Sequence, residues 1–161
     1  MRRFRLLNNS GLTLIELVIA MALMAILAAV ALPMAEVTVV RTKELELRRA
    51  LRDVRTAIDE YHADYQAAVE QKKIFATVDA SGYPEELKAL VEGNDWGGLY
   101  PYKKKYLRRI PRDPFDRYDD GWGLRSYEDE PDSTVWGGND IYDIYSQSDE
   151  IALDGTYYRD W

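Results

Sequence analysis

The longest apolar stretch of the chain runs from Leu17 to Ala35 and contains no charged residue, no Asn and no Gln. Its length is close to the ~20 apolar residues that an α-helix needs to cross the hydrocarbon core of a membrane. A basic leader with Arg2, Arg3 and Arg5 precedes it. The pattern predicts a membrane-spanning helix whose basic end faces the cytoplasm, in agreement with the positive-inside rule.

A second pattern follows from Glu36 to about Ala68, without Gly or Pro. Apolar residues recur there at alternating spacings of four and three, which places them in one stripe on a helix. The stripe consists of Leu47, Leu51, Val54, Ile58, Tyr61, Tyr65 and Ala68. The spacing also suits a coiled-coil seam, but we favour packing on a sheet of the same subunit, because strand-rich sequence follows. Together the two patterns predict one helix of ~55 residues, about 80 Å long at 1.5 Å per residue.

The rest of the chain predicts short elements. Pro84 suits the first turn of a short helix, Glu85 to Val91. Turn residues set off three strand candidates, namely Gly123 to Tyr127, Val135-Trp136, and Ile141 to Tyr145. The predicted fold class is therefore α+β, with a long N-terminal helix packed on a small antiparallel sheet and an irregular C-terminal loop.

Three interpretations of the N-terminal segment remain open: a cleaved signal peptide, an uncleaved anchor, and a membrane helix retained after removal of the leader. The apolar run is longer than the 7–15 residues typical of a signal-peptide core. A carboxylate, Glu16, stands at its edge, and the small residue Gly11 precedes the run instead of following it. A cut at Gly11 would keep the helix and remove the basic head, so we favour the retained helix.

Length and composition narrow the picture further. A chain of 161 residues accommodates one membrane helix and one modest domain. Zero Cys excludes disulfides and thiolate metal sites. The net charge is −7, and residues 112–161 carry 14 Asp or Glu against 4 Arg. Such a surface repels nucleic acid phosphates; it suits hard cations or a basic partner, or it serves solubility alone.

The residue types that form enzyme active sites do not occur here in a pattern that indicates an enzyme. The chain offers no nucleophile–base pair, no phosphate-binding glycine loop and no His-rich cluster, and His62, its only His, is predicted to pack at the surface or at the rim of the core. The segment Ser146 to Gly155 is rich in carboxylates and hydroxyls, the oxygen ligands that Ca²⁺ prefers. On residue types alone this loop is either a calcium site or a solvated acidic loop.

The segment Gly11-Leu12-Thr13-Leu14-Ile15-Glu16-Leu17 resembles the processing site of type IV pilins and pseudopilins. The resemblance implies that a prepilin peptidase cleaves between Gly11 and Leu12 and N-methylates Leu12, where the family more often has Phe or Met. The implied divisions are a leader, a transmembrane and filament-core helix, and a globular head that includes the second half of the long helix: residues 1–11, 12–35 and 36–161.

Two residues of the apolar segment are assembly candidates. A charge within a membrane costs roughly 2.5–3.5 kcal/mol on insertion scales, so we expect Glu16 to have a partner and a function. The resemblance implies that it pairs with the methylated amine of Leu12, on the same or a neighbouring subunit; the alternative is an interfacial position among lipid headgroups. Pro33 is expected to kink or loosen the helix, and the resemblance implies that this happens during filament assembly.

A second segment, Tyr106 to Phe115 with its Ile-Pro-x-Asp-Pro core, is similar to the major pseudopilin of type II secretion systems, which carries Ile-Pro-x-Asp-Pro-Trp-Gly. Phe115-Asp116 replaces the Trp-Gly. The resemblance implies a homopolymer that supports export of folded proteins across the outer membrane. It starts as a single-pass bacterial inner-membrane protein with a periplasmic head. Its implied partners are the prepilin peptidase, minor pseudopilins and an inner-membrane assembly platform, with no nucleic acid.

Two rival functions remain. One is a type IV pilus subunit for adhesion, motility or DNA uptake, but major pilins commonly close their C-terminal loop with a disulfide, which this chain lacks the cysteines to form. The other is a membrane-anchored, calcium-dependent binding protein that never polymerises.

The secretion-type resemblance also implies one Ca²⁺ in the loop after the final strand, where Tyr145-Ser146 matches the family's Tyr-Ser. The implied ligands are Ser148, Asp149, Asp154 and Asp160.

Overall fold

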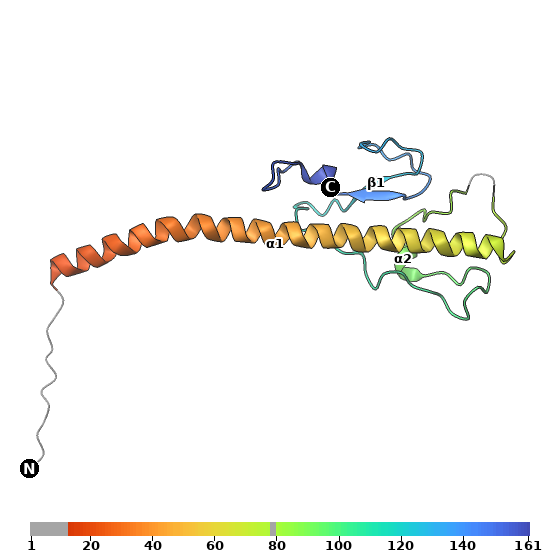
Figure 1. The fold of residues 1–161 in the computed structure, drawn as a ribbon, viewed down its shortest axis with the longest axis horizontal. Helices are drawn as coiled ribbons and strands as arrows, with labels where there is room; N and C mark the ends of the chain where they lie inside the picture. Colours follow the sequence, from red (N-terminus) through yellow and green to blue (C-terminus); the bar gives the residue numbers. More distant parts are fainter. Residues whose placement is uncertain (1–12, 78–79) are drawn as a thin grey trace, which may run out of the picture. The chain divides into compact units, whose positions relative to one another are not determined.

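The computed structural model describes residues 13–77 and 80–161, except for the side chains of residues 30, 32 and 33. In chain order the elements are α1 (Leu14–Glu70), α2 (Ala89–Glu92), β1 (Gly123–Arg125), β2 (Asp143–Tyr145) and the 3₁₀ helix η1 (Tyr158–Asp160). The chain divides into two compact units, Met1–Val40 and Arg41–Trp161. The long helix and the small antiparallel sheet confirm the α+β class (Figure 1).

The helix α1 is 57 residues long and contains both predicted patterns. Its apolar stripe is buried within the second unit, as predicted for packing inside one subunit: Leu47, Val54, Ile58 and Ala68 are all 0% exposed. The helix ends at Glu70, where Lys72 adopts a left-handed backbone conformation and Lys73 N–H bonds the Ala68 carbonyl at 2.9 Å. The later segments of the second unit pack against this stripe.

The core of the second unit forms where later segments cover the stripe of α1. In Figure 1 the strand β1 lies along one side of the helix and α2 along the other. The covering side chains are Leu90, Phe115, Trp122, Ile141, Ile144, Ala152 and Tyr158. Phe115 stacks on Tyr158 with ring centroids 3.8 Å apart, so the aromatic residue that follows Asp-Pro is part of the core.

The described residues hold one sheet of two strands, which is smaller than predicted. β1 and β2 pair antiparallel with Leu124 opposite Ile144. The predicted strand Val135-Trp136 is wrong. The Val135 N–H bonds Ser133 Oγ (3.2 Å), and the Trp136 indole N–H bonds the Asp140 carbonyl (2.7 Å). These local side-chain bonds fix residues 126–140 as a loop instead of a third strand.

The predicted helix Glu85 to Val91 is also shorter than expected, because α2 begins only at Ala89. The N–H groups of its first two residues, Ala89 and Leu90, bond carbonyls three residues earlier, so the segment before α2 forms a tighter turn. Gly93 ends the element at φ 78°, and a Cβ there would lie 2.5 Å from the Lys104 carbonyl oxygen. Only glycine fits both constraints.

Candidate functional site

The start of α1 is fixed by a residue of the processing motif. Thr13 Oγ1 accepts a hydrogen bond from the Glu16 N–H at 3.3 Å, and the Thr13 carbonyl accepts one from the Leu17 N–H at 3.1 Å. Thr13 is therefore the N-cap, and Thr-x-x-Glu is the spacing of a capping box. This role was not predicted above, although the Thr-x-x-Glu spacing is a signal for it. Gly11 and Leu12, the predicted cleavage site, lie outside the described residues.

Glu16 lies in the first turn of α1, and its side chain is exposed. A carboxylate at this end is favoured by the partial positive charge of the helix N-terminus. It is the only charged residue between Leu14 and Ala35. The geometry thus presents one anionic group at the beginning of the apolar first half of α1.

The first half of α1 has no cover in the described structure. It contains an 18-residue window apolar enough to cross a membrane, and none of that window is buried. Large side chains are exposed all around it, such as Leu14 at 81%, Met24 at 69% and Leu27 at 70%. A helix apolar on every side is stable when lipid or other helices surround it.

Pro33 does not interrupt α1, which continues as a helix on both sides of it. A proline lacks the N–H that would bond the carbonyl four residues earlier, so one helical bond is missing there. One turn later, Thr38 Oγ1 donates to the Met34 carbonyl at 2.9 Å. The expected loosening at Pro33 during assembly stays a prediction.

Two of the predicted calcium ligands are ion-paired with arginines. Asp149 lies 3.2 Å from Arg159, and Asp154 lies 3.4 Å from Arg48 on α1. The Thr156 hydroxyl and N–H also donate to Asp154, at 2.6 and 3.0 Å. These bonds, first that of the Thr156 hydroxyl, lower the pKa of Asp154.

The other two predicted ligands do not join them in a cage. Ser148 Oγ accepts the Glu150 N–H at 3.3 Å, and Asp160 lies 3.8 Å from the Arg159 guanidinium. Within residues 13–77 and 80–161, no three His, Cys, Asp or Glu side chains lie close enough to hold a metal ion together. The described arrangement therefore does not fit Ca²⁺ as it stands, and the calcium site stays a prediction.

Two polar residues of α1 hold the C-terminal segment, a role that was predicted for neither of them. Glu44 is 9% exposed and accepts the Leu153 N–H (2.7 Å) and the Tyr158 hydroxyl (3.3 Å). Burial and the nearby Glu44 carboxylate raise the pKa of Tyr158 to about 12.

Arg55 is the second of these residues. It bonds the Asp143 carboxylate at 2.6 Å, and the backbone carbonyls of Ile144 and Trp161 at 3.1 and 2.8 Å. Arg55 is not one of the apolar stripe residues, so the helical spacing alone indicates an outer face of α1. No local pattern reveals a partner 88 residues later in the chain.

His62 packs at the rim of the core, as predicted. Its ring stacks on Tyr83 with centroids 4.1 Å apart and planes 9° apart. Its Nε2 lies 2.7 Å from the Gln66 side-chain nitrogen.

A comparison with protein families gives one match, the prokaryotic N-terminal methylation motif, over residues 6–32. The matched residues include Gly11, Leu12 and Glu16, and they run into the exposed apolar half of α1. The match supports a type IV pilin-like protein that is anchored in a membrane by its N-terminal helix. No curated protein and no solved structure matches the chain.

Proposed function

We propose that the chain is a structural subunit of a type II secretion pseudopilus, a pilin-like filament that supports export of folded proteins across the outer membrane. The observation that carries the proposal is the methylation motif leading directly into α1, whose first half is apolar and exposed. The prepilin peptidase cleaves after Gly11 and methylates Leu12. Residues 12–35 then anchor the subunit in the bacterial inner membrane, with the head, residues 36–161, in the periplasm.

Filament growth transfers the apolar half of α1 from lipid to a bundle of identical helices. Close packing replaces the lipid contacts, and polar groups in such a bundle need partners. Glu16 supplies one such group, and the methylated amine of Leu12 of a neighbouring subunit supplies the other. Each charge offsets the free-energy cost of burying the other in an apolar environment. An incoming subunit is therefore most stable in the register that brings the two groups together. Minor pseudopilins and an inner-membrane platform are the further partners that this role requires.

Two observations favour a secretion filament over its rival, a type IV pilus subunit for adhesion, motility or DNA uptake. These 161 residues contain no cysteine for the disulfide common in major pilins. The Ile-Pro-x-Asp-Pro segment supplies a core aromatic, because Phe115 is 6% exposed. Asp116, which replaces the family's glycine, accepts N–H bonds from residues 118–121 and so shapes the following turn.

The test begins with the mature N-terminus. Mass spectrometry of the membrane-extracted chain should find methylated Leu12 as the first residue in cells with the peptidase and Met1 in cells without it. A mature chain that begins at Met1, or beyond Ala35, in peptidase-containing cells would overturn the proposal.

Filament formation tests the role of Glu16. Glu16→Ala leaves the amine of Leu12 unpaired in an apolar environment, so electron microscopy of overproducing cells should show about 100-fold fewer filaments. Glu36→Ala, another exposed glutamate of α1, is the matched control and should assemble normally. A deletion strain then separates the rivals, because the proposal expects a secretion defect and a pilus subunit expects a motility, adhesion or DNA-uptake defect.

A further inference from the structure

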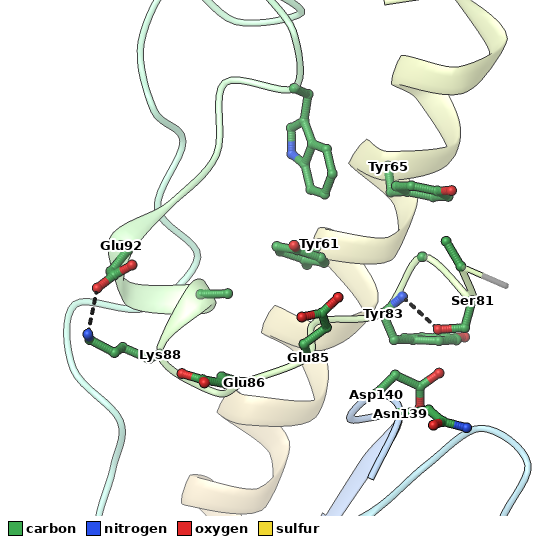
Figure 2. Close-up of a pocket in the computed structure, with 14 residues that line it drawn as sticks. Tyr61, Tyr65, Ser81, Tyr83, Glu85, Glu86, Lys88, Glu92, Asn139 and Asp140 are labelled. Atoms are coloured by element: carbon green, nitrogen blue, oxygen red, sulfur yellow. Dashed lines mark hydrogen bonds and ion pairs between the residues drawn. The ribbon is translucent and has the colours of Figure 1, made fainter. Parts of the chain in front are cut away.

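A groove of about 410 Å³ opens in the second unit between α1 and the segments around residues 81–92 and 139–140 (Figure 2). Aromatic rings form its walls. Trp96 packs edge-on against Tyr61 at 4.7 Å and against Tyr65 at 5.9 Å, and Tyr83 also lines the groove. Glycine at position 82 lets the backbone lie close against the Tyr65 ring, because a Cβ there would lie 2.4 Å from that ring. We call this site the aromatic groove.

The aromatic groove is strongly acidic. Its lining includes four carboxylates, those of Glu85, Glu86, Glu92 and Asp140, and one cation, Lys88, which is paired with Glu92 at 3.0 Å (Figure 2). Glu85 points between the rings of Tyr61 and Tyr83 in Figure 2. The part of the chain that the structure describes gives the carboxylates of Glu85 and Glu86 no hydrogen bond and no ion pair. Two carboxylates at the groove are thus available for a partner.

Burial is the main cause that raises the pKa of two phenols of the groove, and nearby carboxylates add to it. Burial, and after it the charge of Glu85, raises the pKa of Tyr61 despite a hydrogen bond with Asn94. Burial also raises the pKa of Tyr83, with contributions from neighbouring phenols and from the carboxylates of Asp59 and Asp140. The Tyr65 hydroxyl oxygen is buried without a hydrogen-bond partner among the described residues. Acidic aromatic surroundings of this kind favour a cation that can donate hydrogen bonds.

The same chain carries a basic segment, residues 103–109, and four of its five cations face outward. Lys104 points inward and pairs with Asp64 at 2.7 Å. The four other cations are exposed, and none has an ion pair in the described ranges 13–77 and 80–161: Lys103, Lys105, Arg108 and Arg109.

The backbone of this segment is anchored to its own subunit. Lys104 exchanges backbone hydrogen bonds with Asn94 at 2.9 and 3.1 Å, and the N–H groups of Tyr106 and Leu107 bond the Leu90 carbonyl. The anchored backbone presents the four cations to the surroundings of the subunit.

We propose that the aromatic groove binds a cationic side chain of residues 103–109 from a second copy of this chain. The inference rests on the proposed function, because a polymer repeats one head-to-head contact along its length. An ammonium or guanidinium group within about 6 Å of a Tyr or Trp ring centroid is attracted by the ring face. Glu85 and Glu86 supply the charge complement, and an arginine can bond a carboxylate with two parallel N–H groups.

Cysteine cross-linking in cells that assemble filaments tests the contact directly, because these 161 residues contain no cysteine of their own. Glu85→Cys is combined in turn with Lys103→Cys, Lys105→Cys, Arg108→Cys and Arg109→Cys, and the filaments are oxidised. At least one pair should give a ladder of disulfide-linked multimers on non-reducing gels. Glu130→Cys, an exposed acid outside the groove, is the matched control and should give none with the same four partners.

Charge exchange tests whether the contact drives assembly. Glu85→Arg should lower filament number by about tenfold through like-charge repulsion, and so should the change to Glu at the position that cross-links. The two changes combined in one chain should restore filaments, which a merely misfolded head would not allow.

The results separate this inference from the proposed function. Wild-type filaments that need Glu16 but give no ladder with any of the four pairs overturn the groove contact and leave the proposed function intact. Loss of assembly in Glu85→Arg without restoration by the second change also overturns it, since the partner is then not this segment. If the wild-type chain forms no filaments, the proposed function fails and the contact fails with it.

Discussion

At the scale of single residues, Asp64 is the centre of a polar network against the last turns of α1. It is 8% exposed and accepts bonds from Lys104 Nζ and the Tyr106 hydroxyl at 2.7 Å and from the Tyr100 hydroxyl at 2.8 Å. Burial alone would raise the pKa of Asp64, but these three donors outweigh it and lower the pKa. The network ties the segment after α2 to the long helix.

Asp64→Asn should lower the free energy of unfolding by about 2 kcal/mol, because it leaves the half-buried Lys104 ammonium without a counter-charge. The melting temperature of the detergent-solubilised chain, followed by near-ultraviolet circular dichroism, should fall by roughly 8 °C at pH 7. Glu92→Gln breaks an exposed ion pair with Lys88 and is the control, with no measurable change expected.

The pH dependence of this difference has a definite sign. Since the folded-state pKa of Asp64 is depressed, its contribution is complete above the ordinary aspartate value and is lost as the pH falls through the folded value. The gap between wild type and Asp64→Asn should therefore be constant near neutral pH and close below about pH 4. A gap that stayed constant at lower pH would mean that the charge of Asp64 is not what stabilises the network.

Residue roles of this kind were only partly predictable. The run Lys103-Lys104-Lys105 gives no sign in the sequence that its middle member points inward, because Asp64 lies 40 residues earlier. The same holds for Arg55 and Asp143. The Thr-x-x-Glu spacing at Thr13, in contrast, is a local signal that a sequence analysis can use.

At the scale of elements, the exposed and buried faces of α1 can be compared with one residue type. Leu47 is 0% exposed in the core, whereas Leu45, half a turn away on the same helix, is 61% exposed. Leu47→Ala should destabilise the second unit by about 3 kcal/mol, because it removes buried methyl groups and leaves a cavity. Leu45→Ala should change stability by less than about 0.5 kcal/mol.

Thermal unfolding of the two variants in detergent measures this difference. Equal losses of stability would mean that the stripe of α1 is not buried within one subunit. A loss of filaments in Leu45→Ala without a loss of stability would instead place Leu45 in a contact between subunits.

Elements were predictable to the extent that their signals are local. The stripe of α1 follows from spacing along one helix, and its prediction is confirmed. Val135-Trp136 has strand-like residue types, but the outcome depends on Ser133 and Asp140, whose side-chain and backbone groups capture the hydrogen bonds of that segment. The strands β1 and β2 are only three residues each, and their pairing joins segments about 20 residues apart. Short strands of this kind carry little periodicity from which to predict their ends.

At the scale of the whole molecule, residues 112–161 carry 14 Asp or Glu against 4 Arg, and the C-terminal loop within them contacts the long helix through an ion pair. Arg48 on α1 pairs with Asp154 and lies over the Trp161 ring at 4.1 Å. Arginines therefore occupy the carboxylates that the family resemblance assigned to calcium. A bound Ca²⁺ would have to displace Arg48 from Asp154 and Arg159 from Asp149, which requires the loop to rearrange.

Calcium binding and arginine pairing give opposite results on chelation. If the loop binds Ca²⁺, saturation at 100 times the dissociation constant stabilises the fold by about 2.7 kcal/mol, so a chelator should lower the melting temperature of the detergent-solubilised chain. Asp149→Asn and Asp154→Asn should each abolish the effect of the chelator on the melting temperature. Asp132→Asn changes an exposed acid in a different loop and should preserve that effect. If instead the arginines alone fix the loop, both variants melt at one temperature with or without chelator, and so does the wild type. An unchanged wild-type melt, with Mg²⁺ as the ion control, would show that the calcium prediction is wrong and that Arg48 and Arg159 are the counter-ions of this loop.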